Sequence, residues 1–184
     1  MQSLTFLLST VIDLYVFVLL LRVWMQAARA DFYNPFSQFV VKATQPVVAP
    51  LRRLIPGFGG WDIATILLVL VIQIIKFPLL AMVQTGAAFW SLGYILLGVL
   101  ATLKAAGKMI FWVLLIRALL SWVSQGRSPM DYVLYQLTEP MLAPLRRILP
   151  PMGGLDLSVM LLSIILIALN YLGADLFGFM WMQL

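Results

Sequence analysis

Long apolar stretches set the pattern of this chain. A helix needs about 20 mostly apolar residues to cross the hydrocarbon core of a bilayer. Residues 4–25, 63–84 and 157–180 meet that requirement, and shorter polar or turn-forming segments separate them. The pattern therefore predicts at least three membrane-spanning helices.

A fourth apolar region covers residues 87–123, which is too long for one upright span, and Lys104 and Lys108 interrupt it. It fits one helix over 98–123 after an apolar connection over 85–97, or two short spans. The connection itself is compatible with a loop, a re-entrant piece or an extra span. On the helix, small residues recur every four positions, which predicts a close-packing face made by Gly98, Thr102 and Ala106.

An internal repeat favours four spans. Residues 44–62 (TQPVVAPLRRLIPGFGGWD) align with residues 138–156 (TEPMLAPLRRILPPMGGLD) at an offset of 94. Two copies of one unit share one architecture, and the first copy has a single helix before its basic segment. We therefore predict an all-α membrane protein with four transmembrane helices in two tandem repeats, over 1–95 and 96–184. Each repeat is a helix, an amphipathic interfacial segment and a second helix.

The two amphipathic segments cover residues 34–56 and 128–150. In each, apolar residues recur at helical spacing, and we expect two short helices, the second with an arginine pair opposite its apolar side. The predicted apolar positions of the first segment are Phe36, Phe39, Val40, Ala43, Val47, Leu51, Leu54 and Ile55. Those of the second are Met130, Val133, Leu134, Leu137, Met141, Leu145, Ile148 and Leu149.

Capping residues mark where these helices begin. Asn34 and Ser128 each precede a proline, and Ser128 with Asp131 has the pattern of a capping box. Asp62 and Asp156 stand just before apolar stretches and are predicted N-caps of the following spans.

Basic residues gather in and beside the two amphipathic segments, and none lies between Lys76 and Lys104. Lys and Arg near span ends mark the cytoplasmic side. Four spans place both segments in the cytoplasm and both termini on the other side, whereas five would place one basic segment outside.

An amphipathic helix with a basic face lies in the membrane interface, where each Arg or Lys adds about 1 kcal/mol of attraction to an anionic surface. Either these segments only anchor the helices and fix topology, or they dock an anionic lipid headgroup or a partner protein. The candidate lipid- or partner-binding residues are Arg52, Arg53, Arg146, Arg147, Lys42 and Arg127.

Several polar side chains fall inside the predicted spans. Asp13 and Lys76 lie at similar depth in antiparallel helices, and an ionisable group in hydrocarbon needs a partner, so we expect them to pair. In the second repeat we expect a Lys–Asp arrangement of reversed polarity. These groups either fix helix register or line a polar path for an ion. The intramembrane polar candidates are Asp13, Lys76, Lys104, Lys108, Asn170 and Asp175.

Composition narrows the function classes. Hydrophobic residues make up 63% of the chain and charged residues 10%, and the mean hydropathy is +1.03, which indicates lipid surroundings. Cys and His are absent, which excludes cysteine nucleophiles and thiolate metal sites and removes the commonest general base and metal ligand. We therefore expect no enzyme, no catalytic residues, no metal site and no cofactor. The net charge of +5 predicts contact with an anionic bilayer rather than with nucleic acid.

Three motifs carry a family resemblance: FYNPFS at 32–37, WVSQGRSP at 122–129, and the paired Pro-Leu-Arg-Arg-x-x-Pro runs. They resemble the bacterial YggT family, whose relatives are the YlmG proteins. The resemblance implies a multi-pass protein of the bacterial cytoplasmic (inner) membrane, in a family without an agreed activity or agreed site residues. It also implies links to osmotic tolerance, ion homeostasis, cell division and, in plastids, nucleoid partition and cytochrome assembly.

Two functions follow from the sequence. The first is a non-enzymatic scaffold or accessory factor whose basic segments hold anionic lipid or a partner, either another membrane protein or a second copy of the chain. The second is an ion-transport component with a polar centre at Asp13, Lys76, Lys104 and Lys108. Four spans are few for a solute pathway, so transport would need an oligomer or another subunit.

Overall fold

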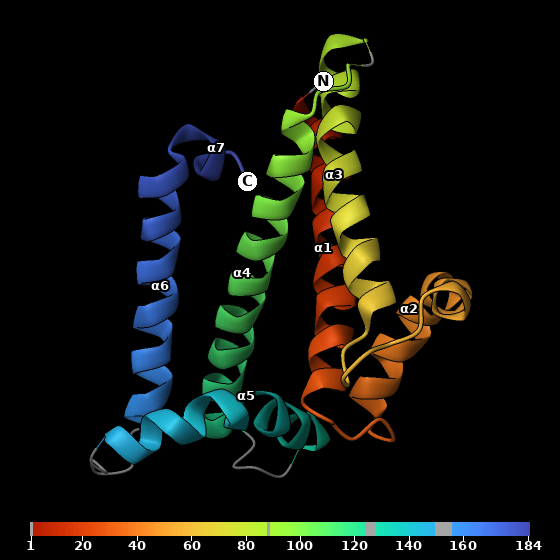
Figure 1. The fold of residues 1–184 in the computed structure, drawn as a ribbon. Helices are drawn as coiled ribbons and strands as arrows, with labels where there is room; N and C mark the ends of the chain where they lie inside the picture. The colour runs from red at the N-terminus through yellow and green to blue at the C-terminus, as the bar shows by residue number, and fades with distance from the viewer. Residues whose placement is uncertain (1, 88, 124–127, 150–155) are drawn as a thin grey trace.

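The computed structural model describes residues 2–87, 89–123, 128–149 and 156–184. In these ranges the chain is all α-helical apart from its connections (Figure 1). Four helices are long and apolar enough to cross a membrane, and the predicted four-span fold class is confirmed. The elements are α1 (Gln2–Ala27), α2 (Pro35–Leu54), α3 (Ile63–Thr85), α4 (Gly93–Val123), α5 (Pro129–Ile148), α6 (Leu157–Phe177) and α7 (Phe179–Met182).

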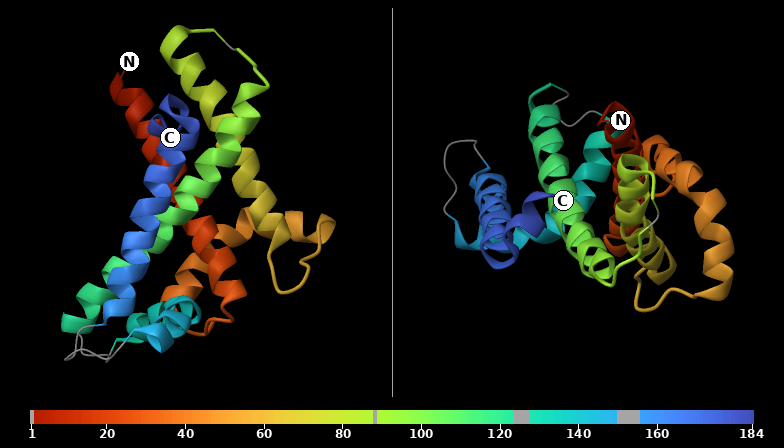
Figure 2. Two further views of the ribbon diagram at one scale, coloured as in Figure 1. Left: turned by 60° about the vertical axis from the view of Figure 1, so that its left-hand side comes forward. Right: turned by 90° about the horizontal axis from the view of Figure 1, so that it is seen from above.

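The long helices α1, α3 and α4 pack together, and α6 stands at the edge of the group (Figure 1). Helices α2 and α5 cross one end of this bundle, and both chain termini lie toward the other end (Figures 1 and 2). The two amphipathic helices therefore share one side of the molecule. Helix α4 packs most extensively against α3, whereas α6 contacts α4, α5 and α7.

The predicted spans differ from the structure by more than two residues at two ends. Helix α4 begins at Gly93 rather than at 98, because the apolar residues before 98 continue the helix. The predicted helix over 157–180 ends at Phe177, since Gly178 (φ 53°, ψ −129°) leaves the helical conformation and α7 follows. Between Thr85 and Gly93 the described residues form a connection without a further helix.

Helix α2 corrects a prediction of the amphipathic segments. Two short helices were expected, but α2 is one helix that contains Pro46 and Pro50, and α5 likewise contains Pro140 and Pro144. A proline inside a helix removes one hydrogen bond and bends the axis without having to end it. Figure 2 shows α2 changing direction along its length.

The predicted apolar face of α2 is only partly the buried one. Val40 and Val48 are buried, but so are Ser37 and Thr44. Other apolar residues of that face are exposed, and in a membrane protein such side chains meet lipid; they are Phe39, Val47 and Leu54. In α5 the buried residues include three of the predicted apolar positions, Val133, Leu134 and Leu137.

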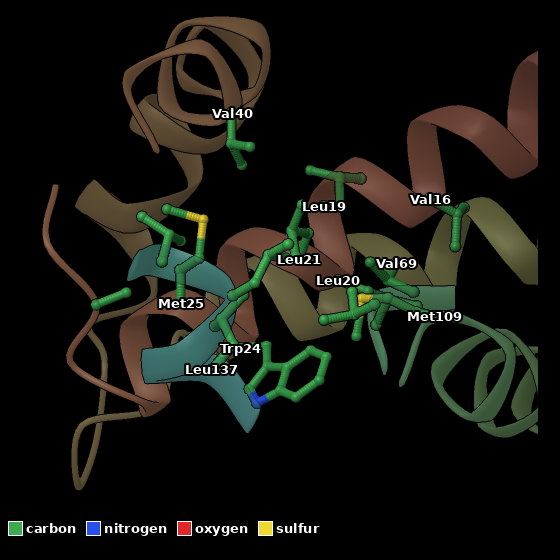
Figure 3. Close-up of a cluster of buried hydrophobic side chains, with 14 of the residues drawn as sticks. Val16, Leu19, Leu20, Leu21, Trp24, Met25, Val40, Val69, Met109 and Leu137 are labelled. Atoms are coloured by element: carbon green, nitrogen blue, oxygen red, sulfur yellow. The ribbon is translucent and has the colours of Figure 1, made fainter. Parts of the chain in front are cut away.

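The core gathers around the half of α1 nearest α2 and α5 (Figure 3). Leu19, Leu20 and Met25 of α1 are buried there. Each neighbouring helix adds a side chain, so one cluster ties both amphipathic helices to three spans; these are Val40, Val69, Met109 and Leu137.

Gly98 lets α3 and α4 approach closely. A Cβ atom at this position would lie 2.4 Å from Ile74 Cγ1 and 2.9 Å from the Ile74 backbone. The close-packing face predicted on α4 therefore contacts α3 at Gly98.

Candidate functional site

The first polar cluster joins α1, α2 and the start of α3. Arg22 of α1 is buried; its Nη1 donates to Thr44 Oγ1 at 2.7 Å and its Nη2 to Gln45 Oε1 at 2.8 Å. Its Nε lies 3.6 Å from Asp62 Oδ2. Arg52 donates two hydrogen bonds to the same carboxylate, one from Nε at 3.1 Å and one from Nη2 at 2.5 Å. This bidentate geometry is the strong form of an Arg–carboxylate contact.

Asp62 also caps α3, as predicted. Its side chain accepts hydrogen bonds from the Thr65 backbone N–H at 3.2 Å and the Thr65 hydroxyl at 2.5 Å. Burial by itself opposes ionisation, but the hydrogen bonds from Arg52 and Thr65 outweigh it and hold the pKa of Asp62 below its ordinary value. Asp62 therefore stays ionised between two guanidinium groups and a helix N-terminus.

The second repeat builds a matching cluster from equivalent positions. Arg117 donates to Thr138 Oγ1, as Arg22 does to Thr44. Arg146 Nη2 donates to Asp156 Oδ2 at 2.6 Å, and Asp156 caps α6, as predicted. Burial again opposes ionisation of Asp156, and hydrogen bonds from Arg146 and Ser158 lower its pKa. The first arginine of each Pro-Leu-Arg-Arg run thus pairs with the N-cap of the next span.

The two clusters differ in charge and in exposure. Glu139 replaces Gln45, and Arg146 Nη1 donates to both of its oxygens, at 2.8 and 2.9 Å. The first cluster therefore holds two cations and one acid, whereas the second holds two of each. The Asp62 side chain is 1% exposed, but that of Asp156 is 39% exposed, so the first cluster is the more tightly enclosed.

The clusters divide the predicted binding residues into two groups. Arg52 and Arg146 are held in ion pairs. Arg53, Arg147 and Lys42 are exposed, and among the described residues none of the three forms an ion pair. Arg127 lies outside the residues that the structure describes.

Each exposed arginine is followed by an exposed apolar residue. Leu54 follows Arg53, and Ile148 follows Arg147; both apolar side chains are 79% exposed. These pairs occupy equivalent positions of the repeat. We call Arg53–Leu54 and Arg147–Ile148 the two end pairs. In each, a cation stands beside an apolar side chain, which suits the boundary between headgroups and acyl chains.

The amphipathic helices also contact each other. Asn34 caps α2 through a hydrogen bond from the Phe36 N–H, as predicted, and its Nδ2 donates to Pro129 O at 2.7 Å. The Asp31 N–H donates to Gln136 Oε1 at 2.9 Å. At the start of α5, the predicted capping box of Ser128 and Asp131 is present. These contacts join the two basic segments into one layer.

Asp13 and Lys76 come together inside the membrane-spanning region. Lys76 Nζ lies 2.6 Å from Asp13 Oδ1, and Ser9 Oγ donates to Asp13 Oδ2 at 3.2 Å. The Lys76 side chain is buried, but 49% of the Asp13 side chain is exposed. The pair therefore joins α1 to α3 and opens toward the surface that faces lipid.

The lysines of α4 have different partners from those expected. Lys104 Nζ donates to Trp181 O at 2.6 Å and lies 5.3 Å from the centre of the Trp181 ring. Asn170 accepts from Trp181 Nε1 at 3.0 Å. Among the described residues no ion pair joins Asp175 to Lys104 or Lys108, so the reversed Lys–Asp arrangement does not form. The reason is α7, which turns back at Gly178 and places Trp181 against Lys104.

Sequence reasoning missed several members of the clusters. It treated the N-cap aspartates only as caps and did not pair them with the arginines. The alignment of the two repeats contained the signal, because Thr, Arg and Asp recur at the same offset. The overlooked polar members are Gln26, Thr44, Gln45, Thr138 and Glu139. Among the described residues no three carboxylates gather in a group that suits a metal ion.

Comparison with known proteins gives consistent matches along the chain. A family profile described as CCB3/YggT matches residues 1–83 and 96–177. The chain is 58% identical over 185 residues to an uncharacterized protein "in proC 3′ region" of Vibrio alginolyticus, covering 100% of each. It is 56% identical to the uncharacterized protein YggT of Escherichia coli K12, covering 92% of this chain and 88% of that one. A Pseudomonas aeruginosa protein is 41% identical, with coverage of 83% and 79%. No solved structure matches.

Proposed function

This chain belongs to the CCB3/YggT family, and we propose that it is a non-enzymatic membrane scaffold or accessory factor. Its paired basic segments hold anionic lipid or a partner protein at the membrane surface. We place that surface on the cytoplasmic face of the inner membrane, with both termini periplasmic, because both basic helices lie at one end of the bundle (Figure 1). The process served is membrane or osmotic homeostasis, or envelope organisation.

The repeated end pairs carry this proposal. Arg52 and Arg146 form ion pairs with the N-cap aspartates, whereas the second arginine of each run, Arg53 or Arg147, is exposed. An exposed cation beside a 79% exposed apolar side chain at the end of each amphipathic helix matches an interface with an anionic bilayer. In the connection after α2, Phe58 and Trp61 are also exposed, and aromatic side chains are enriched at that depth.

The expected strength follows from the number of exposed cations. Lys42, Arg53 and Arg147 each add about 1 kcal/mol near an anionic surface. Removing the charges of Arg53 and Arg147 should therefore weaken the attraction to an anionic bilayer by about 2 kcal/mol, which is about a thirtyfold loss of preference for anionic lipid. Removing Arg52 and Arg146 should instead weaken the fold, because Asp62 and Asp156 would each lose the nearest positive charge.

The test compares two pairs of substitutions on the full chain. Arg53→Gln/Arg147→Gln and Arg52→Gln/Arg146→Gln are purified in mild detergent, and the retained lipids and proteins are identified by mass spectrometry. Arg53→Lys/Arg147→Lys is the matched control, because it changes the same two side chains but keeps both positive charges. The first variant should lose phosphatidylglycerol enrichment at unchanged thermal stability, whereas the second should lose stability.

Three results would decide against the lipid function. Unchanged phosphatidylglycerol enrichment in the Arg53/Arg147 variant rules out the end pairs as lipid sites. Loss of a specific co-purifying protein from that variant, with lipid unchanged, would assign the surface to a partner. Equal loss from the Arg53→Lys/Arg147→Lys control would show that the enrichment does not depend on the charge at these positions.

The alternative function is ion transport through the intramembrane polar residues. The Asp13–Lys76 pair is compatible with it, because about half of the Asp13 side chain is exposed. Lys104 and Lys108 contact other partners, on the α7 side of α4. Cation flux into proteoliposomes that is abolished by Asp13→Asn would favour transport, and flux equal to that of empty vesicles would exclude it.

A further inference from the structure

A groove of about 590 Å³ lies between α4 and α6, at the edge of the bundle where α6 stands apart (Figure 1). It belongs to neither polar cluster, and the inference drawn from it does not rest on the proposed function. Its volume falls within the range of small-molecule sites. Lys104 and Lys108 line it from α4, and apolar side chains line it from both helices, among them Leu103, Phe111, Leu166 and Ile167.

The charged end of the groove lies near the membrane boundary. Helix α6 has 21 residues, about 31 Å at 1.5 Å per residue, which matches a hydrocarbon thickness of about 30 Å. Helix α7 follows its end, and Lys104 Nζ lies 2.6 Å from the carbonyl oxygen of Trp181 in α7. With α6 taken as the span, the ammonium group lies at the α7 end of that span, on the side opposite α2 and α5.

The rest of the groove runs inward from that boundary. Leu166 precedes the end of α6 by eleven residues, a distance of about 16 Å along the helix. On α4, Phe111 lies seven residues, or about 10 Å, below Lys104. The groove is thus positively charged at one end and apolar along its walls. This arrangement is complementary to an amphiphile with an anionic head and an apolar tail.

Neither lysine has an Asp or Glu side chain as a partner in the part of the chain that the structure describes. Lys104 contacts a carbonyl oxygen and an aromatic ring. Lys108 Nζ lies 3.4 Å from a backbone oxygen of Leu184. Two cations one helical turn apart repel each other, and at the edge of the hydrocarbon they are stabilised by an anion.

We propose that an anionic phospholipid occupies this groove, with its phosphate between Lys104 and Lys108 and one acyl chain along the apolar walls. Basic pockets between transmembrane helices bind such headgroups. A partner helix is the other occupant to consider, but it would have to bring an acidic side chain to both lysines, whereas an anionic phospholipid supplies the negative charge and the apolar chain in one molecule.

Tryptophan fluorescence gives a readout that is specific to this groove, because Trp112 lines it. The full chain is reconstituted in phosphatidylcholine with increasing fractions of brominated phosphatidylglycerol or brominated phosphatidylcholine. The Trp112 contribution is the difference from a Trp112→Phe variant. We expect brominated phosphatidylglycerol to quench Trp112 at about a tenfold lower mole fraction than brominated phosphatidylcholine. Unbrominated phosphatidylglycerol should reverse the quenching, and glycerol 3-phosphate, which has no acyl chain, should not.

Two variants block the groove by different means. Lys104→Gln/Lys108→Gln removes the charge. Gly107→Leu fills the groove and keeps both lysines, because a Cβ at Gly107 meets no atom within 4 Å. Each should remove the preference for phosphatidylglycerol. Gly93→Leu, on the same helix outside the groove, and Arg53→Gln/Arg147→Gln, at the other end, should keep it.

Equal quenching by both brominated lipids would overturn the proposal. So would a full phosphatidylglycerol preference in both blocking variants. A groove occupied by a second copy would show as a dimer that Gly107→Leu dissociates, with no lipid preference at Trp112. Because the Arg53/Arg147 variant reports on the opposite surface, failure of this inference and failure of the proposed function give different results.

Discussion

Replacing Asp62 by Asn tests the first polar cluster directly. Asparagine keeps the size of the side chain and remains a good N-cap, so the start of α3 should survive. The change removes the negative charge that faces Arg22 and Arg52. Arg22 is 4% exposed and Asp62 1% exposed, so the remaining guanidinium group would be buried without a counterion. Breaking a buried ion pair in this way costs about 3–5 kcal/mol.

The second repeat supplies the matched control, Asp156→Asn. Asp156 and Arg146 have side chains 39% and 35% exposed, and Arg146 keeps Glu139 at 2.8 Å. An exposed pair of this kind contributes about 0–1 kcal/mol. The same substitution at equivalent positions should therefore differ in cost by about 2 kcal/mol or more.

The assay is equilibrium unfolding of the purified chain, with sodium dodecyl sulfate added to dodecyl maltoside micelles and helix content followed by circular dichroism. Asp62→Asn should lower the free energy of unfolding by at least twice as much as Asp156→Asn. Equal destabilisation by the two substitutions would refute the argument, since burial would then not decide the strength of the pair. A small change in the free energy of unfolding for Asp62→Asn would show that water solvates Arg22 when the carboxylate is absent.

Three further predictions concern other contacts. Because hydrogen bonds from arginine keep the pKa values of Asp62 and Asp156 below the ordinary 3.8, both groups stabilise the fold above that pH. This stability should be lost as pH falls through the lower folded values, and Asp62→Asn should flatten a titration of the midpoint from about pH 6 to about pH 3. Asp13→Asn and Lys76→Gln should show a coupling of about 0.5–3 kcal/mol in a double-mutant cycle, given their 2.6 Å contact; additive effects would argue against the pair. Gly98→Ala should lower the free energy of unfolding by about 1–3 kcal/mol, because the added methyl group overpacks against α3. Gly107→Ala should instead raise it by up to about 1 kcal/mol, because alanine favours the helix. A larger loss of stability from Gly107→Ala than from Gly98→Ala would contradict the packing.

Local features could be predicted well from the sequence. The four spans follow from apolar length, and the N-caps at Asn34, Asp62, Ser128 and Asp156 follow from side chains that satisfy the first backbone N–H groups. Asp13 and Lys76 could be placed at equal depth because the rise per residue is fixed. In these cases the decisive interaction is short in sequence or constrained by helix geometry.

The features that could not be predicted from the sequence depend on tertiary packing. The exposure of Phe39 and Val47 depends on which neighbours cover α2, and hydrophobic spacing cannot distinguish a face packed on protein from one packed on lipid. The pairing of Arg52 with Asp62 needs the connection between α2 and α3 to close back on itself. The partner of Lys104 depends on α7, whose turn at Gly178 breaks an apolar run without a strong sequence signal.

The close packing of α3 against α4 separates the folding unit from the sequence repeat. Helix α4 belongs to the second repeat, but it packs into the group formed by α1 and α3, at Gly98 among other positions. A chain cut in the connection between α3 and α4 would therefore leave a first fragment with an uncovered helix surface and a second fragment without its main support. Neither half is expected to fold as an independent module, and co-expressed halves should recover the native state only by reassociating along that surface. We therefore expect the two sequence repeats to fold together as one bundle.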